Sequence, residues 1–256
     1  EKGFGEYTGY KWGIHLRSPQ IFTGLIKRGG ERFVPLGQIA KVSRGITSGC
    51  DDFFYPSDVT ESALQQNLSD REFKDRYGIR RADTEKVRIV HAGDGSRHLI
   101  EAIYLEPLAF NLMEIDSVSI HSRKLKHSVV QVSATKKALQ GTRVLKYIKW
   151  GEREGFHSRP TCASRDIWYA LDVHQRGDFF WTKAQRYRHI VPLNEQSLIA
   201  NCNLYDIWST DKAVDVRLLC AVMNSTVVAL NKHSFGRTMG GDPLLSSEAD
   251  MREFMK

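Results

Sequence analysis

Three ionisable residues in the first third of the sequence have the types and the order of a metal-dependent nuclease site. Asp58 is followed by Glu72 and Lys74, which form a Glu-x-Lys pair. In such enzymes the carboxylates bind Mg²⁺, which activates a water molecule. The pair lies on a strand there, so that both side chains point to one face. Here Ser69 and Glu72 form a capping box, which predicts a helix, so a Mg-dependent nuclease fragment is an alternative only.

Signatures of other enzyme classes are absent from the sequence. It contains no Gly-x-x-x-x-Gly-Lys-Ser/Thr loop and no Gly-x-Ser-x-Gly turn, and the loop from Gly236 to Pro243 lacks the flanking elements of a dinucleotide site. The histidines include no His-Glu-x-x-His pair. The four cysteines include no Cys-x-x-Cys pair, which indicates a reducing cytoplasm. We therefore expect no catalytic residue, cofactor site or metal site in this chain.

The basic residues are concentrated in the middle of the chain. Residues 117–188 contain 15 Lys and Arg against 5 Asp and Glu, a balance of +10. Residues 1–116 (16 against 17) and 189–256 (6 against 8) are slightly acidic. A localised positive field favours a polyanionic partner such as double-stranded DNA. The charge alone leaves open an alternative, a solvated helix face on a protein-interaction domain.

Helices and strands are expected in blocks along the chain. Apolar periodicity and caps predict helices at residues 18–29, 69–77, 135–150 and 216–230. A short approach and a strand are expected at 36–46, strands at 85–91 and 128–133, and further short strands between 167 and 208. Because the two kinds do not alternate regularly, we expect one α+β domain over residues 1–256, with a mixed, largely antiparallel β-sheet region and flanking helices. No apolar run is long enough to span a bilayer, so no membrane partner is expected.

Two local patterns bear on the binding of a partner. The expected helix at 135–150 carries Lys146 and Lys149 away from its apolar side. The expected strand at 36–46 runs into residues 45–49, Gly-Ile-Thr-Ser-Gly, which we call the glycine turn. Its two glycines predict positive φ or the close approach of another backbone. Arg44, which directly precedes the turn, is expected to project into solvent.

Several strings resemble, in order along the chain, the C-terminal target recognition domain of adenine-N6 DNA methyltransferases. The resemblance is to single-chain, TaqI-like type II restriction-modification enzymes and, more distantly, to the specificity subunits of type I systems. It extends over about residues 12–245. The strings are Leu16-Arg-Ser-Pro19, Val42-Ser-Arg-Gly-Ile-Thr-Ser-Gly-Cys-Asp-Asp-Phe-Phe-Tyr55, Arg159-Pro-Thr-Cys-Ala-Ser-Arg-Asp-Ile-Trp-Tyr169, and Met223-Asn-Ser-Thr-Val-Val-Ala-Leu230 with Phe235-Gly-Arg-Thr-Met-Gly-Gly241.

The resemblance implies a domain that recognises double-stranded DNA and positions a target adenine for the catalytic methyltransferase domain of the same parent chain. Such a catalytic domain carries a Phe-x-Gly-x-Gly-type loop for S-adenosylmethionine and an Asn/Asp/Ser-Pro-Pro-Tyr/Phe motif for the adenine. Neither motif occurs in this sequence. The chain thus resembles an excised recognition half of a cytoplasmic bacterial or archaeal enzyme, with S-adenosylmethionine expected in the parent and not here.

Basic side chains in and near the matching strings are the candidates for contact with DNA, because Arg and Lys bind phosphates and pair with guanine. Each has a structural alternative: Arg165 could form an ion pair beside Asp166, and Arg237 could brace its loop. The aromatic residues Trp168, Tyr169, Phe180 and Trp181 are expected in the core. The DNA-binding candidates are Arg44, Lys146, Lys149, Arg159, Arg165, Lys183, Arg186, Arg188 and Arg237.

Overall fold

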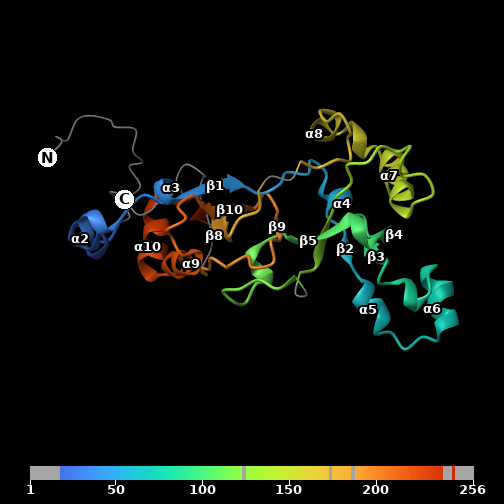
Figure 1. The fold of residues 1–256 in the computed structure, drawn as a ribbon, viewed down its shortest axis with the longest axis horizontal. Helices are drawn as coiled ribbons and strands as arrows, with labels where there is room; N and C mark the ends of the chain where they lie inside the picture. The colour runs from blue at the N-terminus through green and yellow to red at the C-terminus, as the bar shows by residue number, and fades with distance from the viewer. Residues whose placement is uncertain (1–17, 123–124, 173–174, 186–187, 239–243, 246–256) are drawn as a thin grey trace.

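The computed structural model describes residues 18–122, 125–172, 175–185, 188–238 and 244–245. The molecule is elongated, with β-sheet in both halves and helices gathered at its two ends (Figure 1). Of the strand pairs that these residues form in sheets, only one is parallel. The expected α+β class with a mixed, largely antiparallel sheet is therefore confirmed.

The elements follow one another along the chain in short runs of helix and strand. The first half contains α2 (Gln20–Gly29), α3 (Leu36–Ile39), β1 (Ala40–Arg44), α4 (Asp51–Phe54), β2 (Ser57–Asp58), α5 (Thr60–Leu64), α6 (Asp70–Tyr77), β3 (Val87–His91), β4 (Arg97–Glu101), β5 (Leu105–Ala109) and β6 (His127–Val130). The second half contains α7 (Arg143–Arg153), α8 (Pro160–Ala163), β7 (Phe179–Thr182), β8 (Ala184–Gln185), β9 (Ile199–Ala200), β10 (Leu204–Ser209), α9 (Val216–Met223), α10 (Thr226–Phe235), β11 (Arg237–Thr238) and β12 (Leu244–Leu245).

A three-stranded antiparallel sheet, in the order β1-β10-β7, forms the centre of one half. The β1–β10 register places Arg44 opposite Tyr205. Val42, Phe179 and Trp181 from this sheet are buried in one cluster with Met223 of α9. Burial of these large apolar side chains drives the helices onto the sheet. A second small sheet, β11-β12-β8, consists of two-residue strands.

A six-stranded sheet, in the order β4-β3-β2-β6-β5-β9, forms the other half. Phe53 of α4 is fully buried against it, and its ring stacks on Tyr147 of α7 with centroids 4.7 Å apart. Trp150, one turn further along α7, packs at 5.0 Å from Tyr147. This aromatic cluster fixes α7 against the sheet at the end of the molecule where α8 also lies (Figure 1).

Two of the stretches of chain that connect the two larger sheets lie next to each other. The first is the glycine turn, which leads from β1 to α4, and the second is the link from β9 to β10. Ile46 and Asn201 form a parallel bridge between them, in which the Ile46 N–H donates to the Ala200 carbonyl at 2.8 Å. The glycine turn therefore lies at the junction of the two sheets.

Several expected helices are present with shifted ends. Ser69 and Glu72 form the expected capping box at the start of α6, and α2 closes at Gly30, whose φ is 50°. The helix expected at 135–150 begins only at Arg143, because Thr142 accepts a hydrogen bond from the Leu145 N–H as its N-cap. The helix expected at 216–230 is two helices, α9 and α10, which meet at Asn224 and Ser225.

The succession of strands expected between 167 and 208 is wrong in two places. Residues 167–171 form a bend, a turn and irregular chain, and the Trp168 indole donates to Glu152 of α7 at 3.1 Å. Residues 190–193 form only isolated bridges at Leu193. At 167–171 the aromatic residues resemble strand sequence, but Trp168 packs against Phe53 and Phe54 of α4 instead. Phe180, Trp181 and Tyr169 are buried as expected, and Trp168 is half-buried.

In the part of the chain that the structure describes, every helix is too short or too polar to cross a membrane.

Candidate nucleic-acid interface

The glycine turn is held tightly against the rest of the protein at both of its ends. A Cβ atom on Gly45 would lie 2.3 Å from the carbonyl oxygen of Asn201, and one on Gly49 would lie 2.5 Å from Cβ of Thr161 in α8. Gly49 also has a φ of 78°. The expectation of positive φ or close approach is confirmed, since Gly45 has the second property and Gly49 has both.

Arg165 joins the tip of this turn to the segment that follows α8. Its Nη2 donates to the carbonyl oxygens of Thr47 at 3.0 Å and Ser48 at 2.7 Å. Its Nη1 donates to the Trp168 carbonyl at 3.4 Å, and its guanidinium lies 5.3 Å from the centroid of the Phe54 ring. Both terminal nitrogens are thus engaged within the protein.

Arg159 lies at the start of α8, beside the helix that follows the turn. Its Nη2 is 3.2 Å from a carboxylate oxygen of Asp52 in α4, and its guanidinium lies 4.9 Å from the centroid of the Phe156 ring. Both members of this ion pair are partly accessible to water, so the pair contributes little to the free energy of unfolding. The Arg159 guanidinium is therefore available to a further anion.

Helix α7 presents a basic face to solvent. Val144, Tyr147 and Ile148 are buried, whereas Lys146 and Lys149 are exposed. Arg153, in the last turn, is also exposed and continues this row. The first two backbone N–H groups of the helix are bound by Glu101, at 2.6 Å from Arg143 and 3.0 Å from Val144. The fold therefore fixes α7 at its start and turns its lysines towards water.

The other candidate arginines and lysines are distributed over both halves. Arg44 is exposed, as expected, and its Nε donates to the Cys202 carbonyl at 3.0 Å. Arg188 is exposed and donates from Nη1 to the Ile115 carbonyl. Lys183 is half-buried between β7 and β8, and Arg237 lies in β11, paired with Leu245. Arg186 lies outside the described residues.

The turn brings part of the candidate set together. Arg165 binds the turn, Arg44 precedes it, and Arg159 binds the helix after it. Lys183 and Arg237 belong to the elements around β8. Arg188 lies between β8 and β9 and binds Ile115 in the loop between β5 and β6. Contact of any of these side chains with DNA stays a prediction.

The residues of the nuclease alternative lie on different kinds of element. Glu72 and Lys74 are on α6, where positions two apart point in different directions. Glu72 is also engaged in its own helix cap, at 2.8 Å from the Ser69 N–H. Asp58 is on β2, where it accepts from the Thr60 N–H at 2.9 Å. The strand geometry that a Glu-x-Lys nuclease site requires is therefore not formed by this pair.

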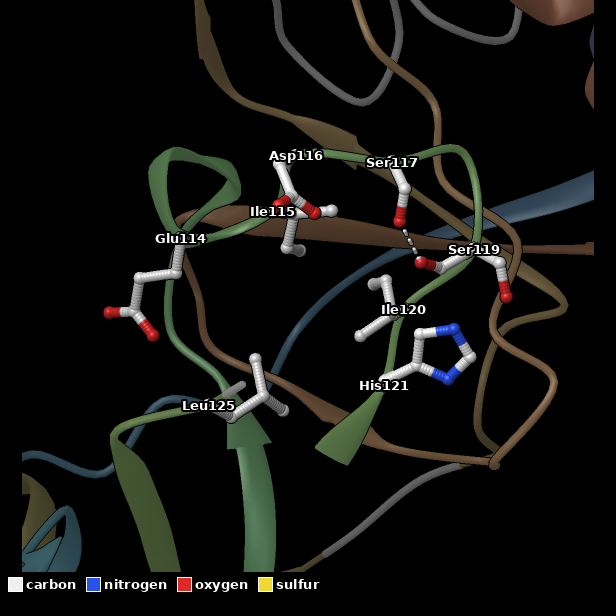
Figure 2. Close-up of a pocket in the computed structure, with 8 residues that line it drawn as sticks. All are labelled: Glu114, Ile115, Asp116, Ser117, Ser119, Ile120, His121 and Leu125. Atoms are coloured by element: carbon white, nitrogen blue, oxygen red, sulfur yellow. Dashed lines mark hydrogen bonds between the residues drawn. The ribbon is translucent and has the colours of Figure 1, made fainter. Parts of the chain in front are cut away.

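A small crevice is formed by the loop between β5 and β6 (Figure 2). Ser117 Oγ donates to the Ser119 carbonyl at 2.6 Å across its rim. Glu114 and His121 lie on opposite sides, so its ionisable groups do not converge on one point (Figure 2). Over the described ranges, no group of three or more His, Cys, Asp or Glu side chains could hold a metal ion. The lining residues are Glu114, Ile115, Asp116, Ser117, Ser119, Ile120, His121 and Leu125.

The thiols next to the glycine turn are not activated. Burial raises the pKa of Cys50 to about 11, and burial likewise raises the pKa of Cys162. Both side chains are therefore neutral thiols at physiological pH. Because the thiolate is the nucleophilic form, neither cysteine is a candidate nucleophile.

Two residues of this region were missed by sequence reasoning. Thr47, at the tip of the turn, is exposed between the buried Ile46 and Ser48. Arg153 extends the basic face of α7 beyond Trp150, where the helix was expected to end. Small polar residues between two glycines are a sequence signal that could have found Thr47.

The fold is similar to that of part of a type IIG restriction endonuclease. A structure described as "Characterization and crystal structure of the type IIG restriction endonuclease BpuSI" superposes on 94% of this chain with a TM-score of 0.53 and 11% sequence identity. The aligned part is 26% of the BpuSI chain, so the present chain spans about a quarter of that enzyme's length. No curated protein matches the sequence.

The family model of the C-terminal domain of the type II methyltransferase M.Eco57I matches residues 108–244, which is more than half of the chain. The chain therefore belongs to this family of methyltransferase C-terminal domains. The match includes α7, α8 and Arg165, and it leaves out the glycine turn. The family resemblance that the sequence strings indicated is confirmed.

Proposed function

We propose that this chain is a sequence-specific DNA recognition domain of an adenine-N6 methyltransferase or restriction-modification enzyme. The observation that carries the proposal is where the positive charge lies in this chain. Residues 117–188 have a charge excess of +10, and they fall within the part that matches the methyltransferase C-terminal domain family. Of that segment, Lys146, Lys149 and Arg153 are exposed along one helix. Exposed cations of this kind release counterions when they bind phosphates, and this release dominates the affinity of proteins for DNA.

Recognition of particular bases requires a second kind of contact. Phosphate contacts set the position of a protein on the duplex, and a few side chains at the groove edges read the sequence. The glycine turn fits the second role, because its backbone is fixed at Gly45, at Gly49 and through Arg165. A fixed backbone lowers the entropy cost of placing a side chain against a base.

The chemistry of methyl transfer belongs, in this proposal, to another domain of the parent chain. Residues 1–256 form the recognition domain, which positions an adenine flipped out of the duplex for that catalytic domain. S-adenosylmethionine binds to the parent's catalytic domain. Restriction-modification proteins act on DNA in the cytoplasm of bacteria and archaea, and we propose the same location for this protein.

The proposal is tested by titrating the chain with a fluorescent random-sequence duplex at several salt concentrations. A DNA recognition domain loses affinity steeply as salt rises, in proportion to the number of phosphates it contacts. A protein-interaction domain with incidental basic charge gives no salt-dependent binding, and that result would contradict the proposal. Cleavage of the duplex that depends on added Mg²⁺ would instead support the nuclease alternative.

A further inference from the structure

The tip of the glycine turn presents a single side chain to solvent. Ile46 is 4% exposed and Ser48 is 1% exposed, whereas Thr47 between them is exposed. The Tyr55 hydroxyl donates to the Ile46 carbonyl at 3.1 Å, and the Ser48 hydroxyl is bound to Asp51. Within the described residues, the Thr47 hydroxyl has no hydrogen-bond partner. It is thus free to bind another molecule.

The backbone of the tip cannot rotate freely around Thr47. Arg165 binds the two consecutive carbonyl oxygens of Thr47 and Ser48 from the protein side. Because these carbonyls face Arg165, the Thr47 side chain is held away from the core. Removal of the guanidinium would release both carbonyls. The orientation of the Thr47 side chain would then be restrained only by the packing of the two glycines.

The chemistry of Thr47 suits the edge of a base pair. A threonine hydroxyl both donates and accepts a hydrogen bond, and its methyl group can contact the methyl group of thymine. Arg44 and Arg159 are both exposed and lie on either side of the turn. Arg44 binds the Cys202 carbonyl, and Arg159 binds Asp52. Their positive charges suit the phosphates on either side of a base pair that Thr47 reads.

Resting on the proposed DNA-recognition function, we propose that Thr47 is a specificity-determining residue which contacts a base edge, and that Arg165 is a positioning residue which orients it. The two act as a unit: Arg165 itself touches no base, because both of its terminal nitrogens bind protein atoms. The ligand is one or two base pairs within the recognised duplex.

The test is selection from a library of random duplexes by the 256-residue chain, followed by sequencing of the bound DNA. We compare the unchanged chain with Thr47→Val, Thr47→Ser and Arg165→Ala. Thr47→Val is expected to lower the preference at one or two positions of the motif about tenfold or more, and Thr47→Ser to restore part of it. Arg165→Ala is expected to lose preference at the same positions.

Matched controls separate orientation from stability. Thr210→Val makes the same chemical change at another exposed threonine, and Arg176→Ala removes an arginine that binds the Ser197 carbonyl far from the turn in sequence. Both controls are expected to keep the motif unchanged. If Arg165→Ala fails to fold, the comparison of Thr47→Val with Thr47→Ser still decides whether the turn reads DNA.

Three outcomes would overturn all or part of the proposal in different ways. A motif that is the same for the unchanged chain and Thr47→Val removes Thr47 from recognition while the proposed function stands. The absence of any motif for the unchanged chain overturns the proposed function, and this inference with it. A loss of affinity for all sequences in Arg165→Ala, with no change of motif, makes Arg165 a purely structural residue.

Discussion

Arg165 donates a hydrogen bond of 2.7 Å to the carbonyl oxygen of Ser48, a residue 117 positions earlier in the chain. This bond joins the segment after α8 to the glycine turn at the junction of the two sheets. The turn and the segment belong to two of the strings that resemble target recognition domains. Their direct contact brings the two strings together in one local structure.

The packing of the glycine turn predicts a specific loss of stability. Gly49 and Gly95 have nearly the same φ, 78° and 81°, but only Gly49 has Thr161 within reach of an added Cβ. Gly95→Ala should therefore cost about 1 kcal/mol of unfolding free energy for the backbone alone. Gly49→Ala should cost clearly more, because Thr161 must also move. Equal losses in urea unfolding would show that the turn is not packed against α8 as described.

The basic face of α7 predicts the salt dependence of DNA binding. Replacement of Lys146 and Lys149 by Glu should weaken binding about equally for all duplex sequences, and it should reduce the salt slope by about one for each phosphate that is no longer bound. The same charge change at Arg71 and Lys74 on α6 is the control, because both are exposed. If the two variants bind DNA equally well in a fluorescence titration, α7 is not part of the interface.

Arg44 is expected to contribute to DNA binding more than to stability. Its side chain is exposed and holds one carbonyl, that of Cys202. Arg44→Ala should alter which sites the full-length enzyme methylates, or how strongly, and should shift the melting temperature by only a few degrees. A large fall in melting temperature would instead assign Arg44 to the structure of the sheet junction.

The buried Lys232 predicts a pH dependence of stability. Its Nζ donates to the Thr182 carbonyl at 3.1 Å and lies 4.7 Å from the centroid of the Trp181 ring. Burial lowers its pKa well below the ordinary 10.5. Between the lowered folded-state pKa and 10.5 the unfolded chain binds the extra proton, so stability rises with pH in that window.

Lys232→Met removes the titratable amine, so the variant lacks this contribution to the pH dependence of stability. The variant should gain stability over the unchanged chain at the low end of that window, and the gain should shrink as the pH approaches 10.5. Urea unfolding of both proteins at several pH values measures the difference, in which contributions of other groups cancel. A difference that does not change with pH would show that Lys232 carries no perturbed pKa.

The sequence predicts that this chain does not bind S-adenosylmethionine. Neither the cofactor loop nor the adenine motif of the catalytic domain is present in the 256 residues. Isothermal titration at micromolar concentrations should therefore give no one-to-one binding heat. A clear saturating heat would mean that the chain contains a cofactor site of another kind.

Local signals in the sequence predicted those parts of the fold that local interactions determine. The capping box at Ser69 and the glycines of the turn specify their own backbone geometry, and both were found. The strand expected at 167–171 was wrong, because Trp168 packs on Phe53 of α4, which is more than a hundred residues earlier in the chain. Such a contact leaves no periodic signal in either segment.

The candidate site shows the same division between local and long-range information. The exposure of Lys146 and Lys149 followed from helical periodicity alone. The bonds of Arg165 to the turn could not be read from its neighbours in sequence, which suggested contact with DNA or, as the structural alternative, an ion pair beside Asp166. Thr47 was missed for a related reason: the two glycines mark the turn in the sequence, but the burial of Ile46 and Ser48, which leaves Thr47 as its exposed residue, is a property of the fold.

Competition binding decides whether this chain recognises particular DNA sequences. A duplex that carries the motif enriched from the random library is compared with a scrambled duplex of the same composition, at fixed physiological salt. We predict that the chain binds the motif duplex at least about a thousandfold more tightly, as specific DNA-binding proteins do. Equal affinity for the two duplexes would contradict sequence-specific recognition and would leave only sequence-independent binding to phosphates.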